Sequence, residues 1–140
     1  MLLSKRARLI HRILIVEDEP LVAFDNEHFL RDAGFEVVAT VDRVEDAVKV
    51  IRDDDIDLIL ADVRLSDGEE GIDVAHAAHA RGIPVLFVTG FCPIEAQALA
   101  VGCLAKPYTP RELRAAIDAV EGRLAGHPAK RPPKGLTLFG

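Results

Sequence analysis

The sequence lacks an apolar run long enough to span a bilayer, and its basic start, MLLSKRARLIHR, lacks the apolar segment and cleavage-like site of a signal peptide. It also lacks an excess of positive charge. Its net charge of −6 argues against a surface that mainly binds nucleic acid. It has only two cysteines, Cys92 and Cys103, at a spacing that fits no metal motif. We therefore expect a cytoplasmic protein, without membrane insertion, in which both cysteines are reduced thiols. A disulfide is the alternative.

What is present is a chain of 140 residues, long enough for one domain with a real core. Short apolar runs alternate with segments of helical spacing. The expected strands are residues 13–16, 35–41, 56–62, 84–88 and 102–105, and the expected helices are residues 20–33, 43–53, 71–81, 94–101 (short at most) and 111–125. Continuous apolar strands separated by helices predict an α/β fold. We expect a doubly wound, five-stranded parallel sheet with helices on both faces.

The composition changes after residue 126, where the segment HPAKRPPKGLTLFG holds three prolines and three basic residues. We expect a short basic extension over residues 1–11, the domain over 12–126 and a poorly ordered tail over 127–140. A docking segment formed by Leu136, Leu138 and Phe139 is the alternative for the tail. No second domain follows, so we expect no DNA-binding output module.

Polar side chains stand at the end of four predicted strands. Glu17 and Asp18 follow the first strand, Asp62 the third, Thr89 the fourth and Lys106 the fifth. Each is unremarkable alone, since acids often cap helices and lysines are often surface charges. In doubly wound sheets, however, the carboxyl ends of the strands form the ligand site, so these groups are expected to converge.

The three acids of this set repel one another, and they favour either proton uptake or a bound cation. No histidine or cysteine lies among them, and oxygen ligands with open positions suit Mg²⁺. A hydroxyl and an ammonium opposite the metal match the remaining oxygens of a phosphoryl group. An aspartate can form an acyl phosphate as a nucleophile. The pattern therefore predicts a phosphoryl-accepting aspartate, Asp62.

The sequence VEDE at residues 16–19, with Asp62, Thr89 and Lys106-Pro107, resembles the receiver domain of two-component response regulators over residues 12–125. The resemblance implies strand order 2-1-3-4-5. It implies that Asp62 takes a phosphoryl group from the phosphohistidine of a histidine kinase or phosphotransfer protein. It also implies a stand-alone signalling protein, with autophosphatase activity but no separate substrate, acting by protein contact as a monomer or weak dimer.

The same resemblance assigns roles around the phosphoryl group. Asp18, Asp62 and the main-chain carbonyl of Arg64 bind Mg²⁺ directly, and Glu17 holds it through water. Thr89 moves to bond the phosphoryl group. Lys106 pairs with one of its oxygens, and the Lys106–Pro107 bond is cis.

A narrower resemblance lies in residues 84–91, PVLFVTGF, which look like the receiver subgroup named for its FAT-G motif, with Val88 replacing the alanine. Two positions depart from the common receiver pattern. Ser66 replaces a proline, in a loop, SDGEEG, that looks longer than usual, and Cys103 replaces the switch aromatic. We expect Tyr108 to pack rather than to act as a switch.

Two phenylalanines each have a functional interpretation and one without a function. Phe91 lies two residues beyond Thr89 and either shields the acyl phosphate or packs in the core. Phe24 falls off the apolar face of the first helix, and it is either a partner contact, as the resemblance suggests, or an ordinary exposed aromatic.

Three other functions compete with this interpretation. A non-phosphorylated pseudo-receiver interaction module normally loses an acid or the lysine, and none is lost here. A phosphohydrolase with an aspartate nucleophile needs a second aspartate two residues on, where Arg64 stands. Flavin binding needs a Ser/Thr/Gly phosphate loop after the first strand, and the acids of VEDE stand there instead.

Overall fold

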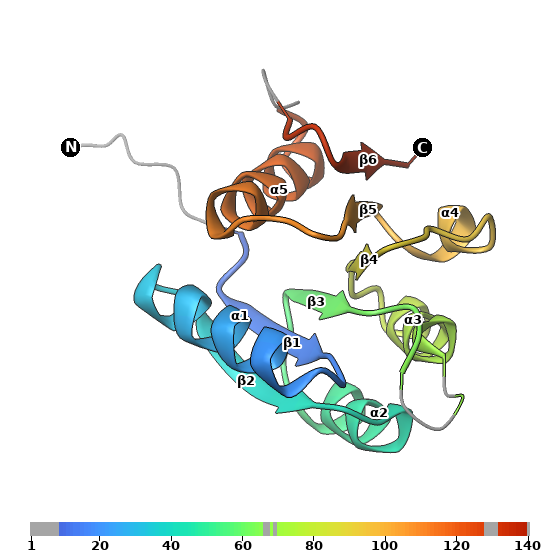
Figure 1. The fold of residues 1–140 in the computed structure, drawn as a ribbon. Helices are drawn as coiled ribbons and strands as arrows, with labels where there is room; N and C mark the ends of the chain where they lie inside the picture. The colour runs from blue at the N-terminus through green and yellow to red at the C-terminus, as the bar shows by residue number, and fades with distance from the viewer. Residues whose placement is uncertain (1–8, 66–67, 69, 128–131, 140) are drawn as a thin grey trace.

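In the computed structural model, residues 9–65, 68, 70–127 and 132–139 are described, and within them five parallel strands form the centre of the molecule (Figure 1). The strands are β1 (Arg12–Val16), β2 (Glu36–Val41), β3 (Leu58–Ala61), β4 (Val85–Thr89) and β5 (Gly102–Ala105). The helices are α1 (Pro20–Asp32), α2 (Val44–Asp53), α3 (Gly71–Ala80), α4 (Ala96–Leu99) and α5 (Pro110–Leu124). Each predicted segment is confirmed in type, including the shortness of α4.

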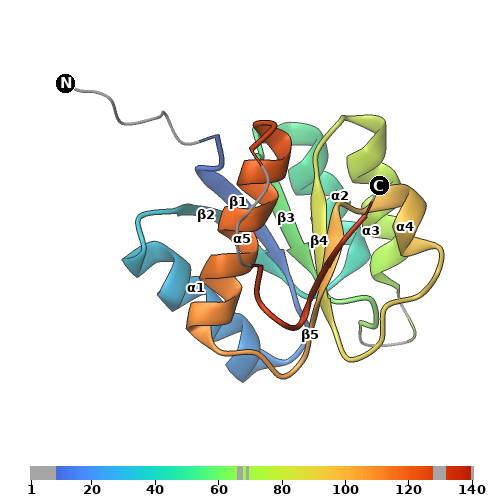
Figure 2. The same ribbon diagram turned by 90° about the horizontal axis from the view of Figure 1, so that it is seen from above.

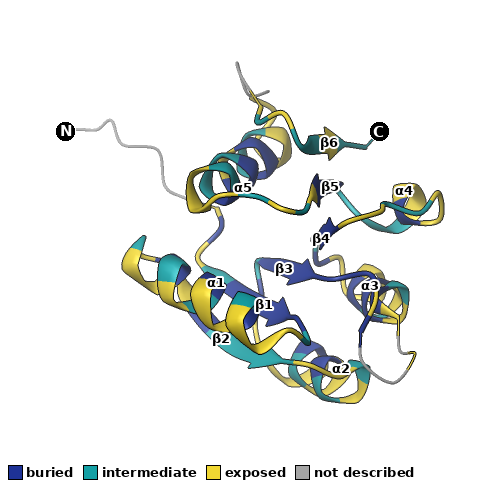
Figure 3. Cartoon of the chain, viewed as in Figure 1, coloured by how far each residue is buried: buried dark blue, intermediate teal, exposed yellow. Residues whose placement is uncertain are grey.

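The five parallel strands are ordered β2-β1-β3-β4-β5, as the resemblance implied, but the sheet has six strands rather than the predicted five. Helices α1 and α5 cover one face of the sheet, and α2, α3 and α4 cover the other (Figures 1 and 2). Two buried clusters fill the space between the sheet and these two helix layers. The central strands are dark blue in Figure 3, because both of their faces are covered. This burial explains why their sequences are continuous apolar runs.

The two long helices beside the sheet edge that carries Glu17 and Lys106 begin at prolines. Pro20 and Pro110 stand in the first turn of α1 and α5, where a missing N–H costs no helical hydrogen bond. Thr109 caps α5 by accepting from the Glu112 amide, and the Glu112 side chain accepts from the Thr109 amide. These starts fix where the chain leaves the edge that carries Glu17 and Lys106.

The C-terminal tail differs from the prediction. A sixth strand, β6 (Leu136–Leu138), pairs antiparallel with β5, and the Phe139 amide donates to the Val101 carbonyl over 2.9 Å. A Cβ on Gly102 would lie 2.5 Å from the Thr137 carbonyl oxygen, so glycine permits this approach. The prediction of a poorly ordered tail was wrong for residues 132–139. Residues 128–131 and 140, like residues 1–8, lie outside the described ranges.

The alternative considered for the tail, a docking segment, is what these residues form. Leu136 and Leu138 pack against one apolar cluster and Phe139 against the other. Composition suggested disorder because the segment holds three prolines and three basic residues. The unpaired edge of β5, which decides the outcome, is visible only once the sheet is assembled.

The cysteines also differ from the prediction. Cys92 and Cys103 are joined by a disulfide, with their Cα atoms 6.3 Å apart. The expectation of two reduced thiols was wrong in this structure. The two cysteines lie eleven positions apart in sequence. Only the turn from β4 through α4 into β5 brings them together.

No helix in the described part of the chain combines the length and apolar character that a bilayer span requires.

Candidate phosphoryl-acceptor site

The carboxyl ends of β1 and β3 lie side by side, because Val16 pairs with Ala61 in the parallel register. The backbone pairing continues one step further. The Asp62 amide donates to the Val16 carbonyl over 3.0 Å, and the Glu17 amide donates to the Val41 carbonyl over 2.9 Å. Glu17 and Asp62 are therefore carried on backbone that the sheet holds in place.

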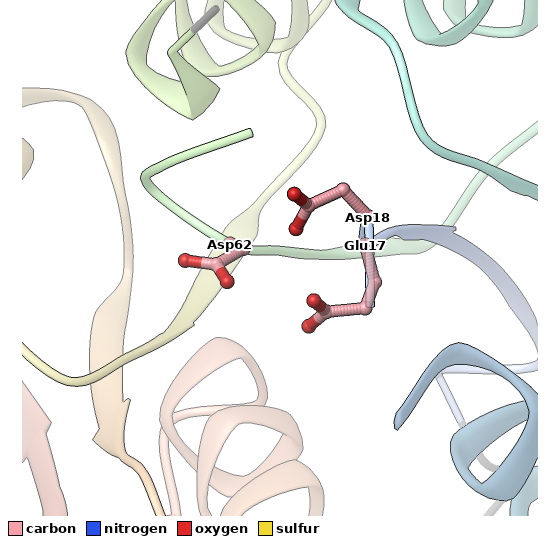
Figure 4. Close-up of side chains that lie close together, drawn as sticks. All are labelled: Glu17, Asp18 and Asp62. Carbon is pink, nitrogen blue, oxygen red and sulfur yellow. The ribbon is translucent and has the colours of Figure 1, made fainter. Parts of the chain in front are cut away.

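Three carboxylates from these two strand ends face one small space (Figure 4). Glu17, Asp18 and Asp62 each offer an oxygen, and these atoms lie within 4.8 Å of one another. Glu17 and Asp62 are only 2% and 8% exposed. Like charges this close favour a bound cation, and a set made only of oxygen ligands matches Mg²⁺. The structure thus brings together the three acids that the sequence singled out.

Lys106 reaches into the same space from the end of β5. Its Nζ donates to Asp62 Oδ2 over 2.8 Å, to Glu17 Oε1 over 3.0 Å and to Glu19 Oε1 over 3.3 Å. The backbone holds it there, because the Lys106 amide donates to the Thr89 carbonyl over 2.9 Å. The Lys106–Pro107 bond is cis, as the resemblance implied. The contact from Glu19 was missed, although VEDE places a third acid within reach of the site.

Burial and the charges of the site shift two pKa values. Burial raises the pKa of Glu17 above its usual range, and the hydrogen bond from Lys106 offsets part of that rise. For Lys106, burial alone would lower the pKa, but its hydrogen bonds to Asp62 and Glu17 and the charges of these acids raise it overall. Lys106 is therefore a fixed cation at neutral pH, and the raised pKa of Glu17 means that it takes up a proton at a higher pH than an ordinary glutamate does.

Thr89 is buried at the end of β4, one strand from Asp62. Its hydroxyl donates to the Phe91 carbonyl over 3.1 Å and accepts from the Phe91 amide at 3.3 Å. In this structure the hydroxyl therefore bonds to its own loop. The predicted contact with a phosphoryl group requires the hydroxyl to leave Phe91.

The start of α3 lies close to the backbone of Asp62. The Arg64 amide donates to Asp62 Oδ1 over 3.2 Å, and Arg64 forms an isolated antiparallel bridge with Glu70. A Cβ on Gly71 would lie 2.0 Å from the Asp62 carbonyl oxygen, so the start of α3 lies directly against the acceptor residue. Metal binding by the Arg64 carbonyl stays a prediction. Residues 66, 67 and 69 of the departing loop lie outside the described residues.

A cavity of about 470 Å³ opens beside Lys106, between α1 and the start of α5. On its wall the Asn26 side chain donates to the Tyr108 hydroxyl over 2.8 Å. Tyr108 also packs against an apolar cluster, which confirms its packing role.

Phe24 and Phe91 are 65% and 70% exposed. The core alternative for Phe91 is therefore wrong, while the partner role of Phe24 stays a prediction.

Comparison with known proteins matches this arrangement to one family. A protein-family model described as the response regulator receiver domain matches residues 13–118. The phyllosphere-induced regulator PhyR of Methylorubrum extorquens is 34% identical over 118 residues, which cover 80% of this chain and 44% of that protein. The transcriptional regulatory protein PdtaR of Mycobacterium tuberculosis is 31% identical over 123 residues, which cover 84% of this chain and 60% of that protein.

Solved structures give the same result. The response regulator PhyR from Brucella abortus superposes with a TM-score of 0.75 at 29% identity, over 85% of this chain and 51% of that one. SdrG from Sphingomonas melonis superposes with a TM-score of 0.70 at 36% identity, over 81% of this chain and 98% of that one. Against PhyR and PdtaR, the chain spans about half of the relative's length.

Proposed function

Because the chain belongs to the response regulator receiver domain family, we propose that Asp62 accepts a phosphoryl group from a phosphohistidine and that the chain signals by protein contact. The donor is a histidine kinase or a histidine phosphotransfer protein. One observation carries the proposal. Asp62 lies at a fixed strand end, 2.8 Å from the ammonium of Lys106 and beside two further acids.

The chemistry follows from these groups. A carboxylate oxygen of Asp62 forms a bond to phosphorus, the phosphorus–nitrogen bond of the donor breaks, and the donor imidazole takes up a proton. Lys106 then pairs with a phosphoryl oxygen, and Thr89 donates to another after its hydroxyl leaves Phe91. Water then attacks the phosphorus of the acyl phosphate, the bond between the Asp62 oxygen and phosphorus breaks, and inorganic phosphate leaves, which restores the Asp62 carboxylate. The chain thus has autophosphatase activity without a separate substrate.

Glu17, Asp18, Asp62 and the main-chain carbonyl of Arg64 are the groups that would hold Mg²⁺, with Glu17 acting through water. The acids fit the ion, because they offer only oxygen atoms within 4.8 Å of one another. When bound, Mg²⁺ neutralises charge on the phosphoryl oxygens.

The named relatives support a regulatory role, since PhyR and PdtaR are both described as regulators. For this chain we extend that role to contact with a kinase or phosphotransfer protein and with a downstream protein. We place the chain in the cytoplasm, together with those donors. The acidic surface, with a net charge of −6, supports a protein partner rather than DNA.

Phosphotransfer profiling of the purified chain against the histidine kinases of its cell tests the proposal. We expect transfer from at least one kinase to the wild-type chain and none to Asp62→Ala. Asp118→Ala is the matched control, because Asp118 is an exposed acid on α5. Its transfer should equal that of the wild type.

A wild-type chain that no kinase phosphorylates would instead favour a pseudo-receiver, which binds partners without phosphorylation. The presence of all three acids and of the lysine around Asp62 argues against that function.

A further inference from the structure

The disulfide ties the loop that follows Thr89 to the neighbouring strand. Cys92 is the third residue after Thr89, and Cys103 lies within β5. The two ends differ in their surroundings. Cys103 is buried at 4% exposure, where its strand is paired with β4 on one side and β6 on the other, whereas Cys92 is only half-buried in the loop. The bond therefore fixes a loop residue to one of the best-held positions of the sheet.

This tie lies next to the turn that holds the Thr89 hydroxyl. Thr89 exchanges two hydrogen bonds with the backbone of Phe91, and Phe91 is the residue directly before Cys92. The cross-link restricts how far the chain at Cys92 can move from β5, and so it restricts the turn itself. A hydroxyl that must reach a phosphoryl group on Asp62 first has to leave this turn.

From this arrangement we infer that Cys92 and Cys103 form a reversible oxidation site that controls the Thr89 loop. As a disulfide, the pair holds the loop in the conformation where Thr89 bonds to Phe91. As a dithiol, it releases the loop, and the Thr89 hydroxyl becomes free to bond to the phosphoryl group. The effect on phosphorylation rests on the proposed function of Asp62, whereas the oxidation site and its effect on the loop do not.

The reductant is a low-molecular-weight thiol such as glutathione, and the oxidant is the corresponding disulfide. A thiolate attacks the sulfur of Cys92, the more exposed partner. The Cys92–Cys103 bond breaks, and Cys103 leaves as a thiolate that takes up a proton. A second small thiolate attacks the mixed disulfide at its small-molecule sulfur and releases Cys92. The protein gains two electrons and two protons, while two small thiols become one disulfide.

The experiment places the full chain in glutathione buffers of graded thiol-to-disulfide ratio and takes three measurements. These are the number of free protein thiols, the amide exchange of residues 90–101, and the phosphoryl occupancy reached with acetyl phosphate and Mg²⁺. Cys92→Ser is the control, because it removes the cross-link at the half-buried loop residue and leaves the buried Cys103 in place.

We expect both thiols to appear together as the buffer becomes reducing, and amide exchange in residues 90–101 to become faster. Phosphoryl occupancy should rise about tenfold, because the released Thr89 hydroxyl adds one hydrogen bond to the charged phosphoryl group. Cys92→Ser should match the reduced wild type in exchange and in occupancy at every ratio.

Thiols that stay reduced at every ratio would overturn the inference, and so would equal exchange in the two redox states. Equal, non-zero occupancy in the two states would overturn the control of Thr89. If neither state accepts a phosphoryl group, the proposed function of Asp62 fails. Thiol number and exchange then still decide whether the oxidation site controls the loop.

Discussion

Glu17 keeps a carboxylate in a position that is only 2% exposed. Burial raises its pKa, so the folded chain takes up a proton at a higher pH than the unfolded chain, whose glutamate has the usual value of 4.5. Stability from this group therefore increases as the pH falls through the raised pKa, and it levels off below 4.5.

We predict that the free energy of unfolding of the wild type, minus that of Glu17→Gln, grows as the pH falls from neutral towards 4.5. Glutamine cannot titrate, so the comparison cancels the other groups. Urea unfolding in the presence of a chelator measures it. A difference that stays flat or shrinks on acidification would show that Glu17 is not held at a raised pKa.

Lys106 is the shared cation of the site. Replacing it by methionine leaves Asp62 and Glu17 buried without the ammonium that lies 2.8 and 3.0 Å from them. We predict a loss of about 2 kcal/mol in the free energy of unfolding without Mg²⁺, and partial recovery when Mg²⁺ is added. Chemical denaturation measures both effects. Lys49→Met, an exposed change on α2, is the control, and an equal effect of the two substitutions would contradict the account.

Most residues of the site were predictable from the sequence, because residues that follow parallel strands meet at one edge of the sheet. Glu17, Asp62 and Lys106 needed only the strand ends to be located. The bond from Lys106 to Glu19 depends on how the chain turns into α1, and the bonds between Thr89 and Phe91 depend on the loop after β4. Strand periodicity carries no information about either turn.

Between the elements, the junction of β3 and α3 depends on one glycine. Helix α3 starts so close to β3 that a Cβ on Gly71 would lie 2.0 Å from the Asp62 carbonyl oxygen. We predict that Gly71→Ala lowers the free energy of unfolding by about 2 kcal/mol, since the backbone that carries Asp62 must shift.

Thermal or urea unfolding measures this loss. Gly90→Ala is the matched control, because a Cβ there has nothing within 4 Å and needs no special backbone angle. A Gly71→Ala chain as stable as Gly90→Ala would show that the contact between α3 and β3 is looser than the structure indicates.

The elements that were predicted arise from local sequence patterns, whereas those that were missed arise from contacts between segments far apart in the sequence. The strands and helices of the domain have apolar spacing, prolines and caps in their own sequences, and so they were found. Strand β6 owes its order to the open edge of β5 and to the absence of a side chain at Gly102. The disulfide likewise depends on the path through α4. Contacts between distant segments decided both, and local patterns do not record them.

For the whole molecule, the acidic cluster links cation binding to folding. A cation that binds only the folded chain stabilises it by mass action, by about 2.7 kcal/mol at one hundred times the dissociation constant. We predict that Mg²⁺ raises the melting temperature of the wild type, measured against sodium chloride at equal ionic strength.

Asp18→Asn should remove most of this shift, because it takes away one of the three clustered carboxylates. Asp118→Asn, on the exposed side of α5, should keep it. An equal shift in both variants would mean that Mg²⁺ acts elsewhere on the surface.

The proposed function makes this chain a phosphoryl acceptor and Asp62 the residue that is modified. The most direct test incubates the thiol-reduced full chain with acetyl phosphate and Mg²⁺ and locates the modification by peptide mass spectrometry. We predict one base-labile phosphoryl group on the peptide that contains Asp62, lost in Asp62→Asn and when Mg²⁺ is chelated. An unmodified wild-type chain, or a phosphoryl group that persists in Asp62→Asn, would contradict the account.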